Sequence, residues 1–233
     1  MTPAKGRLPS LSAALAGIPA GIQVVGPWMG RRQLMVRFAA EAETATIYTA
    51  DALRGELTRL STRSHYHSIA IVGGDALAEH EFLEKAFHPA AALPVMIDHD
   101  GQRPESLTGL IDSLALMQVS MSGAEGAAVV ERICASIDIA ARNQVAHAIV
   151  LVPDNAIGDA PLLRIVEQVH EASAASQIVV HAVVERAPEQ DRRWVHWLER
   201  AMAVHEDVRI FPRWPLSARS APTDVEPRNT HSG

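Results

Sequence analysis

Two groups of histidine and acidic residues carry the kinds of atoms that bind metal ions. His65 and His67 precede a short apolar run, and Asp98, His99 and Asp100 end another. A neutral imidazole between two carboxylates suits Zn²⁺ or a first-row metal. However, Asp100 is followed by glycine, a strong turn pair, and the two groups lie at opposite ends of their predicted strands. We therefore predict no metal site here.

A glycine pair followed by an acid marks the end of a second apolar run. Gly73, Gly74 and Asp75 lie at the point where residues 68–74 pass into a helical pattern. Two glycines let a ligand approach the backbone closely, and a carboxylate there could meet an ammonium group. The alternative is an ordinary turn between a strand and a helix, capped by Asp75.

An alternation of strands and helices would position these residues. Short β-branched runs are each followed by apolar residues at spacings of three and four, which predicts a parallel sheet with crossover helices. Strands are predicted over residues 33–39, 68–74, 93–98, 114–120, 147–153 and 177–184, with a last extended piece over 208–211. Helices are predicted after Thr49 or Asp51, and over 79–87, 104–112, 124–143, 159–173 and 188–204. Runs without polar alternation favour a barrel or a doubly wound sheet.

The length of 233 residues suits one large α/β domain. Residues 1–20 are predicted to be an N-terminal arm or a first short helix around residues 11–16, and residues 21–214 form the predicted domain. From residue 215 onward the chain contains proline, serine and charge without periodicity, which predicts a disordered tail.

Composition argues against several classes of protein. The chain has 21 basic and 27 acidic residues, a formal net charge of −6, and gives no sign of a nucleic-acid footprint. Its single cysteine, Cys134, lies in an apolar helical pattern, so a disulfide framework or a cysteine-ligated cluster is not expected within one chain. No segment approaches the ~20 apolar residues of a membrane span. We expect a soluble cytoplasmic protein.

The last predicted helix carries an aromatic stripe. Trp194 and Trp197 share one face of it, and core packing is the usual interpretation. The alternative is a protein interface, for which Trp28 and Trp214 are two further candidates.

A longer pattern resembles the 7-carboxy-7-deazaguanine synthases, a family of radical S-adenosylmethionine enzymes. That family opens with a run like S-I-Q-G-E-G-P-x-x-G-R and a strand like V-F-V-R-F. The residues in register here are Ile22, Gln23, Gly26, Pro27, Gly30, Arg31, Val36, Arg37 and Phe38. Weaker similarities continue to Arg213. The resemblance implies an open partial (β/α)6 barrel of the radical-SAM type.

The cluster cysteines of that family are missing. Glu41, Ala45 and Tyr48 stand where the C-x3-C-x2-C motif would be. Alanine has no ligand atom, a carboxylate and a phenol prefer other metals, and Cys134 is far along the chain. The resemblance therefore implies no iron–sulfur cluster and no radical-SAM lyase activity, and leaves only binding of S-adenosylmethionine without cleavage.

Several ligand-binding positions of the family are nevertheless occupied by polar residues or glycine. Gln23 and Arg37 match its substrate side, where an amide could meet a pterin edge and a guanidinium a carboxylate. The alternative for Arg37 is an internal pair with a neighbouring acid. Gly73, Gly74 and Asp75 match its G-G-E motif at the methionine end of the cofactor, and Ser122 and Gly123 match a turn near cofactor and substrate.

The resemblance predicts a pseudoenzyme. It would act as a partner subunit, or as a binding protein for a pterin- or deazapurine-like ligand, and the family's habit suggests a homodimer. One alternative is an enzyme of that type that retains a non-radical or other-metal activity, and another is a structural module of a larger assembly.

Overall fold

Ten strands pair into one continuous sheet in the computed structural model, which describes residues 11–89, 91–154, 156–184 and 192–213. The order across the sheet is β10-β9-β8-β7-β6-β5-β3-β1-β4, and β2 pairs with β3. The strands are β1 (Ser12–Gly17), β2 (Ala20–Ile22), β3 (Arg32–Phe38), β4 (Thr46–Thr49), β5 (Ser68–Val72), β6 (Val95–His99), β7 (Leu116–Met121), β8 (Ala146–Leu151), β9 (Gln177–Val183) and β10 (Val208–Arg213). All the strands from β5 to β10 run parallel to β3, whereas β1, β2 and β4 pair antiparallel.

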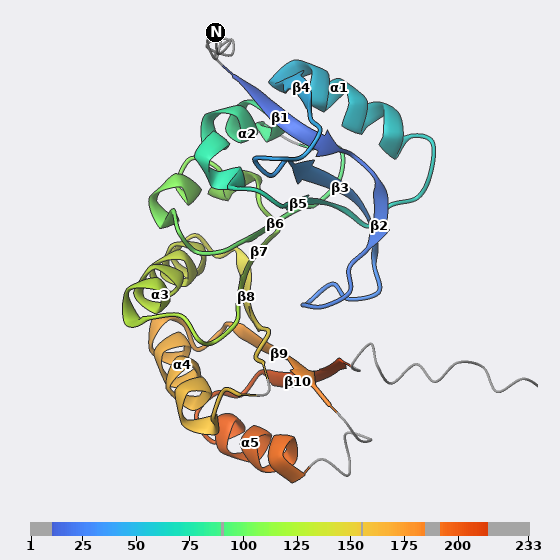
Figure 1. Ribbon diagram of the computed structural model, residues 1–233. Coiled ribbons are helices and arrows are strands. Elements are labelled where there is room, and N and C mark those ends of the chain that lie inside the picture. The colour runs from blue at the N-terminus through green and yellow to red at the C-terminus, as the bar shows by residue number, and fades with distance from the viewer. Residues whose placement is uncertain (1–10, 90, 155, 185–191, 214–233) are drawn as a thin grey trace, which may run out of the picture.

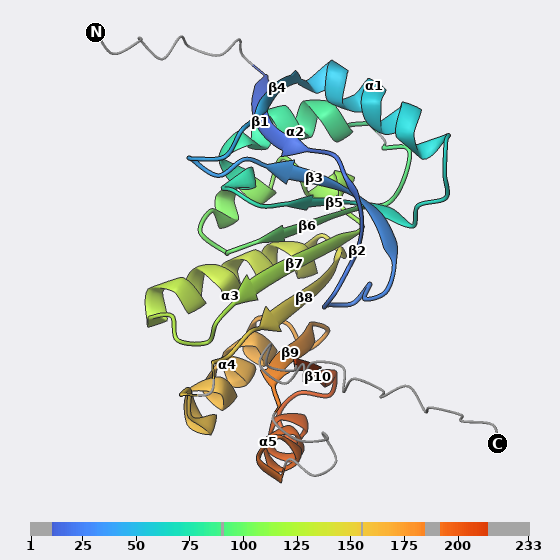
Figure 2. The same ribbon diagram turned by 45° about the vertical axis from the view of Figure 1, so that its right-hand side comes forward.

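Crossover helices connect the parallel strands. They are α1 (Ala50–Ser61), α2 (His80–Phe87), α3 (Ala127–Arg142), α4 (Asp159–Ala172) and α5 (Arg192–Met202). Successive parallel strands are neighbours in the sheet, and crossovers of one hand then place every helix on the same side. Figures 1 and 2 show the helices together on one face, with β2 on the other side. The order of the parallel strands never reverses, so the sheet is not doubly wound.

The two faces of the sheet have different packing. The large apolar core lies between the helices and alternate strand residues such as Ile71, Ile97 and Val119. The opposite face, here called the inner face, carries a small apolar cluster of Ala70, Met96 and Leu116. Trp28, Met35 and Val72 pack against that small cluster. The inner face is therefore only partly covered.

The structure corrects the predictions in three places. Residues 12–17 form β1, a strand between β3 and β4, and not a short helix. Strand β4 was not predicted. The predicted helix over 104–112 consists of two short 3-10 helices, Pro104–Leu107 and Ile111–Ser113, because Gly109 interrupts the segment.

Other local predictions are confirmed. The hydroxyl of Thr49 caps α1 by accepting a hydrogen bond from the backbone N–H of Ala52 at 3.2 Å. Trp194 and Trp197 are 4% and 0% exposed and pack in the core, so the interface interpretation fails for both. Cys134 packs partly buried against the same core. Trp214 and the predicted tail, residues 215–233, lie outside the described residues.

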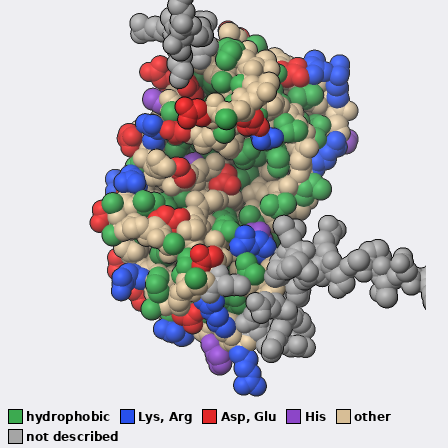
Figure 3. Space-filling view, viewed as in Figure 1, with side chains coloured by type: hydrophobic (Ala, Val, Ile, Leu, Met, Phe, Trp, Pro, Cys, Tyr) green, Lys and Arg blue, Asp and Glu red, His purple; other side chains and the backbone are tan. Residues whose placement is uncertain are grey.

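Two global features bear on the expected class of protein. None of the described helices has both the length and the apolar character needed to cross a bilayer. Acidic and basic side chains are interspersed over the face seen in Figure 3.

Candidate functional site

A small pocket of about 190 Å³ lies on the inner face, between the sheet and the chain that leaves β2. Strands β3, β5, β6 and β7 form its floor, and residues 22–25 form its rim. Its lining residues are Ile22, Gln23, Val24, Val25, Gln33, Met35, Ala70, Val72, Met96, Asp98 and Gln118. We call it the inner-face pocket.

A hydrogen-bonded row of side chains crosses this pocket. Ser120 and Gln118 donate to the two carboxylate oxygens of Asp98 at 2.7 and 2.9 Å. The amide nitrogen of Gln23 donates to the amide oxygen of Gln118 at 3.0 Å and to the carbonyl of Val25 at 2.8 Å. These bonds fix the direction of the row, because carbonyl and carboxylate oxygens can only accept.

The row ends in an unpaired acceptor. Gln23 is 7% exposed, and its side-chain oxygen is buried without a hydrogen-bond partner. A buried acceptor left unpaired costs about 1–3 kcal/mol. Each carboxylate oxygen of Asp98 also keeps acceptor capacity beyond the bonds it receives. The polar groups of this row therefore lack donors, not acceptors.

Burial dominates the electrostatics of Asp98. It raises the pKa of the Asp98 carboxyl, while the hydrogen bonds from Ser120 and Gln118 lower that pKa and only partly offset the burial. A further hydrogen-bond donor beside Asp98 would therefore stabilise the charged form of its carboxyl group.

The loop between β2 and β3 holds Gln23 in place. The backbone N–H of Gln23 donates to Arg31, and the N–H of Gly30 donates to Gln23. Gly26 has a φ of +105° and lies so close to the row that a Cβ there would be 2.0 Å from the Gln118 side-chain oxygen. Only glycine fits this position.

The carboxyl edge, formed by the loops that follow the parallel strands, holds the other predicted site residues. Arg37, at the end of β3, pairs with Glu43 at 3.0 Å, as in the internal-pair alternative. Asp75 pairs with Arg103 at 2.7 Å and makes no capping hydrogen bond. Neither side chain lines the inner-face pocket.

The backbone conformation after β5 requires both glycines of the motif. Gly73 and Gly74 have φ values of +77° and +50°. A Cβ on Gly73 would be 3.0 Å from the carbonyl oxygen of Phe38, and one on Gly74 would be 3.1 Å from the Phe38 side chain. The pair is needed for a close turn against the end of β3.

An internal carboxylate occupies the turn at Ser122 and Gly123. Both backbone N–H groups donate to Glu125 at 2.7 Å. Burial tends to raise the pKa of Glu125, but these hydrogen bonds outweigh it and the pKa lies below its usual value. The turn therefore already holds an anion.

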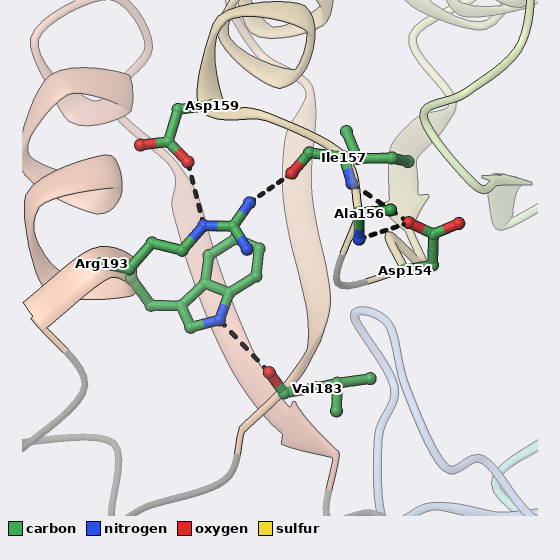
Figure 4. Close-up of polar contacts among 7 residues, drawn as sticks. Asp154, Ala156, Ile157, Asp159, Val183 and Arg193 are labelled. Atoms are coloured by element: carbon green, nitrogen blue, oxygen red, sulfur yellow. Dashed lines mark hydrogen bonds and ion pairs between the residues drawn. The ribbon is translucent and has the colours of Figure 1, made fainter.

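The loop after β8 follows the same pattern (Figure 4). The carboxylate of Asp154 accepts hydrogen bonds from the backbone N–H groups of Ala156 and Ile157 at 2.8 and 3.1 Å. Arg193 donates to Asp159 at 3.1 Å and to the carbonyl of Ile157, which ties α5 to this loop.

The residues considered for metal binding do not converge. Glu41 and Ala45 are exposed, whereas Tyr48 lies half-buried on β4. His99 points to the helix face, next to Met117, and burial lowers its pKa to about 4. His65 is exposed. Within the described ranges, no three His, Cys, Asp or Glu side chains form a group that could hold a metal ion.

The sequence interpretation found Gln23 but missed most of the row. Asp98 was considered only with His99 and Asp100, although alternate strand residues point to opposite faces. Asp98 therefore shares the inner face with Met96, and the same alternation joins Gln118 and Ser120 to Leu116. The turn at Asp100 and Gly101 is confirmed: Gly101 has a φ of +75° and Asp100 accepts from the N–H of Gln102.

No protein-family model matches the chain, and no curated protein is significantly similar to it.

Proposed function

We propose that the protein binds a small flat ligand in the inner-face pocket, with ligand N–H groups donating to Asp98 and Gln23. One observation carries the proposal: the buried side-chain oxygen of Gln23 has no partner, at the end of a row that contains a buried carboxyl. A donor-bearing ligand would recover the free energy that the unpaired acceptor costs.

The size of the pocket supports a compact ligand. Drug-sized ligands use pockets of ~300–1,000 Å³, whereas this one holds about 190 Å³. Such a volume suits one small ring system. The side chains of Met35, Met96 and Val72 offer apolar contact for the faces of a ring.

A pterin or a deazapurine has the chemistry that these groups would recognise. Pterins and deazapurines of the 7-deazaguanine type both carry an amino group beside a ring N–H, so one edge presents neighbouring donors to a carboxylate, which accepts with both oxygens. The resemblance to 7-carboxy-7-deazaguanine synthases supports the same class, because Gln23 matches a substrate-side position there. The proposal thus includes membership of that family and a partial (β/α)6 barrel of its type.

In this proposal the protein is a pseudoenzyme and does not cleave S-adenosylmethionine. Glu41, Ala45 and Tyr48 occupy the cluster positions, and the edge groups that would face a cofactor have internal partners. A homodimer or a role as partner subunit remains a prediction of the resemblance.

Calorimetric titration of the full chain with 6-carboxytetrahydropterin, a deazapurine, GTP and S-adenosylmethionine tests the proposal. We expect a pterin or deazapurine to bind, and Asp98→Asn to weaken it at least ~10-fold through loss of charge-assisted hydrogen bonds. Asp100→Asn, which changes an exposed turn carboxylate, should bind like the wild type.

Thermal unfolding of each variant separates loss of binding from loss of folding. If Asp98→Asn does not fold, Gln23→Met provides the test, because it removes the unpaired oxygen together with the amide nitrogen that donates to Gln118 and Val25. Equal binding by the wild type and both pocket variants would contradict the proposal, and so would the absence of binding by any of the four compounds.

A further inference from the structure

A second and larger hollow, of about 570 Å³, lies at the amino ends of β7, β8 and β9. We call it the amino-end hollow. Pro27 and Trp28 from the loop between β2 and β3 form one wall, and the turns after α3 and α4 form the other. Its volume falls within the ~300–1,000 Å³ that small-molecule sites occupy.

Most polar groups around this hollow are paired within the protein. His147 is 6% exposed, and its Nδ1 lies 2.8 Å from the carbonyl of Val145, so Nδ1 carries the proton. Its Nε2 then accepts from the hydroxyl of Ser173 at 2.9 Å. The same hydroxyl oxygen accepts from the backbone N–H of Ala175 at 3.3 Å.

Among the described residues that line the hollow, Gln177 has the one buried side-chain acceptor without a partner. The residue belongs to the first position of β9 and lies opposite Ala148 of β8, on the floor of the hollow. The hollow therefore lacks one hydrogen-bond donor at its floor.

The remaining surface selects a neutral, aromatic partner. None of the described lining residues is Asp, Glu, Lys or Arg. Trp28 is half-buried, with its ring edge-to-face against His67 at 4.8 Å between centroids, and this contact helps to hold the indole in place. Leu116, Ala146 and Pro27 add apolar surface. A flat ring gains most from such a wall.

We propose that the amino-end hollow is a ligand site for a neutral heteroaromatic ring that carries one N–H donor. The ring packs against Trp28, and its N–H donates to the Gln177 side-chain oxygen. The site does not depend on the ligand proposed for the inner-face pocket, because the two sites share no lining residue: Val24 and Val25 line that pocket, and Trp28 lines this hollow.

Benzimidazole and 1-methylbenzimidazole form a matched pair of probes, because the methyl group replaces only the N–H. Titration of the full chain is followed by calorimetry and by tryptophan fluorescence, with Trp28→Phe identifying the signal of Trp28. We expect benzimidazole to quench Trp28 and to bind about fivefold more tightly than its methyl derivative, the effect of one net hydrogen bond.

Two variants test whether the probe binds in the amino-end hollow. Gln177→Met keeps the length of the side chain but removes the acceptor, so it should abolish the preference for benzimidazole and raise the melting temperature of the free protein. Ala146→Leu, at an exposed lining position, should fill the hollow and remove binding of both probes. Asp100→Asn should change neither.

Three results would overturn the proposal. They are equal binding of the two probes to the wild type, a preference that survives Gln177→Met, and no binding of either probe to a folded wild type. Either of the last two would indicate that a water molecule, and not a ligand, satisfies Gln177.

Discussion

The carboxyl edge and the inner face use similar polar residues in opposite ways. At the edge, Arg37, Asp75 and the turn at Ser122 are each paired with a nearby residue of the same chain. On the inner face, the row from Ser120 through Asp98 and Gln118 ends at the unpaired oxygen of Gln23. A residue in register with a family motif can therefore serve to anchor a loop, and the proposed ligand site depends instead on hydrogen-bonding capacity that the protein leaves unused.

The largest expected effect comes from Gly26→Ala, which should disrupt the hydrogen-bonded row on the inner face. A Cβ would lie 2.0 Å from the side-chain oxygen of Gln118, so the row must shift. Overpacking costs about 1–3 kcal/mol and the positive φ about 1 kcal/mol more. Urea unfolding should show a loss of about 3 kcal/mol, and binding in the inner-face pocket should weaken as well.

Gly30→Ala is the matched control for this change. Gly30 has a φ of +79° in the same loop, but nothing lies within 4 Å of a Cβ built there. It should lose only the ~1 kcal/mol of backbone strain. Equal losses for the two variants would show that the loop moves freely away from Gln118.

Glu125→Ala should disrupt the turn at Ser122 and Gly123 on the carboxyl edge. It removes the acceptor of two backbone hydrogen bonds, which should lower the free energy of unfolding by about 2 kcal/mol. Ligand binding in the inner-face pocket should persist. Glu131→Ala, at an exposed position of α3, the helix that follows this turn, should change stability by less than ~0.5 kcal/mol. If Glu125→Ala loses ligand binding and Glu131→Ala keeps it, the carboxyl edge and the inner-face pocket are functionally coupled.

The pH dependence of stability should have opposite signs in the two regions. Folding raises the pKa of Asp98, so its stabilising contribution is present in acid and is lost as the pH rises through the native pKa. Folding lowers the pKa of Glu125, so its contribution is present above the ordinary carboxyl pKa and is lost as the pH falls through the native pKa.

Urea unfolding of Asp98→Asn and Glu125→Gln from about pH 3 to pH 8 measures this contrast. As the pH rises, Asp98→Asn should gain stability relative to the wild type, and Glu125→Gln should lose it. The first change should occur above the ordinary carboxyl pKa and the second below it. Parallel curves for the two variants would show that both carboxyls have the same environment.

Arg37→Ala should have the smallest effect. Its ion pair with Glu43 is exposed, and such pairs contribute about 0–1 kcal/mol. Calorimetry should find ligand binding unchanged, because Arg37 does not line the inner-face pocket. If a folded Arg37→Ala protein no longer binds the ligand, Arg37 belongs to the binding site, and this part of the comparison is wrong.

The fold could be predicted further than the site. The parallel strands and the Thr49 cap follow from local patterns, and the structure confirms them. The Ala-rich residues 12–17 suit a helix or a strand equally well, and pairing with β3 and β4 decides between them. For the site, Gln23 follows from the resemblance, but its contact with Gln118 joins residues 95 positions apart. No local pattern contains such a contact.

Local sequence patterns were enough to locate the parallel strands and most of the helices between them, because hydrophobic period, capping and glycine conformation act over a few residues. Residue type needs no structure, so the sequence also shows that positions 41, 45 and 48 carry no cysteine. Which polar groups find hydrogen-bond partners depends on contacts between distant residues, which the local patterns do not contain. Crossovers on one side of the sheet left the other face partly uncovered, and there the row reaches Gln23 without a donor for its last acceptor.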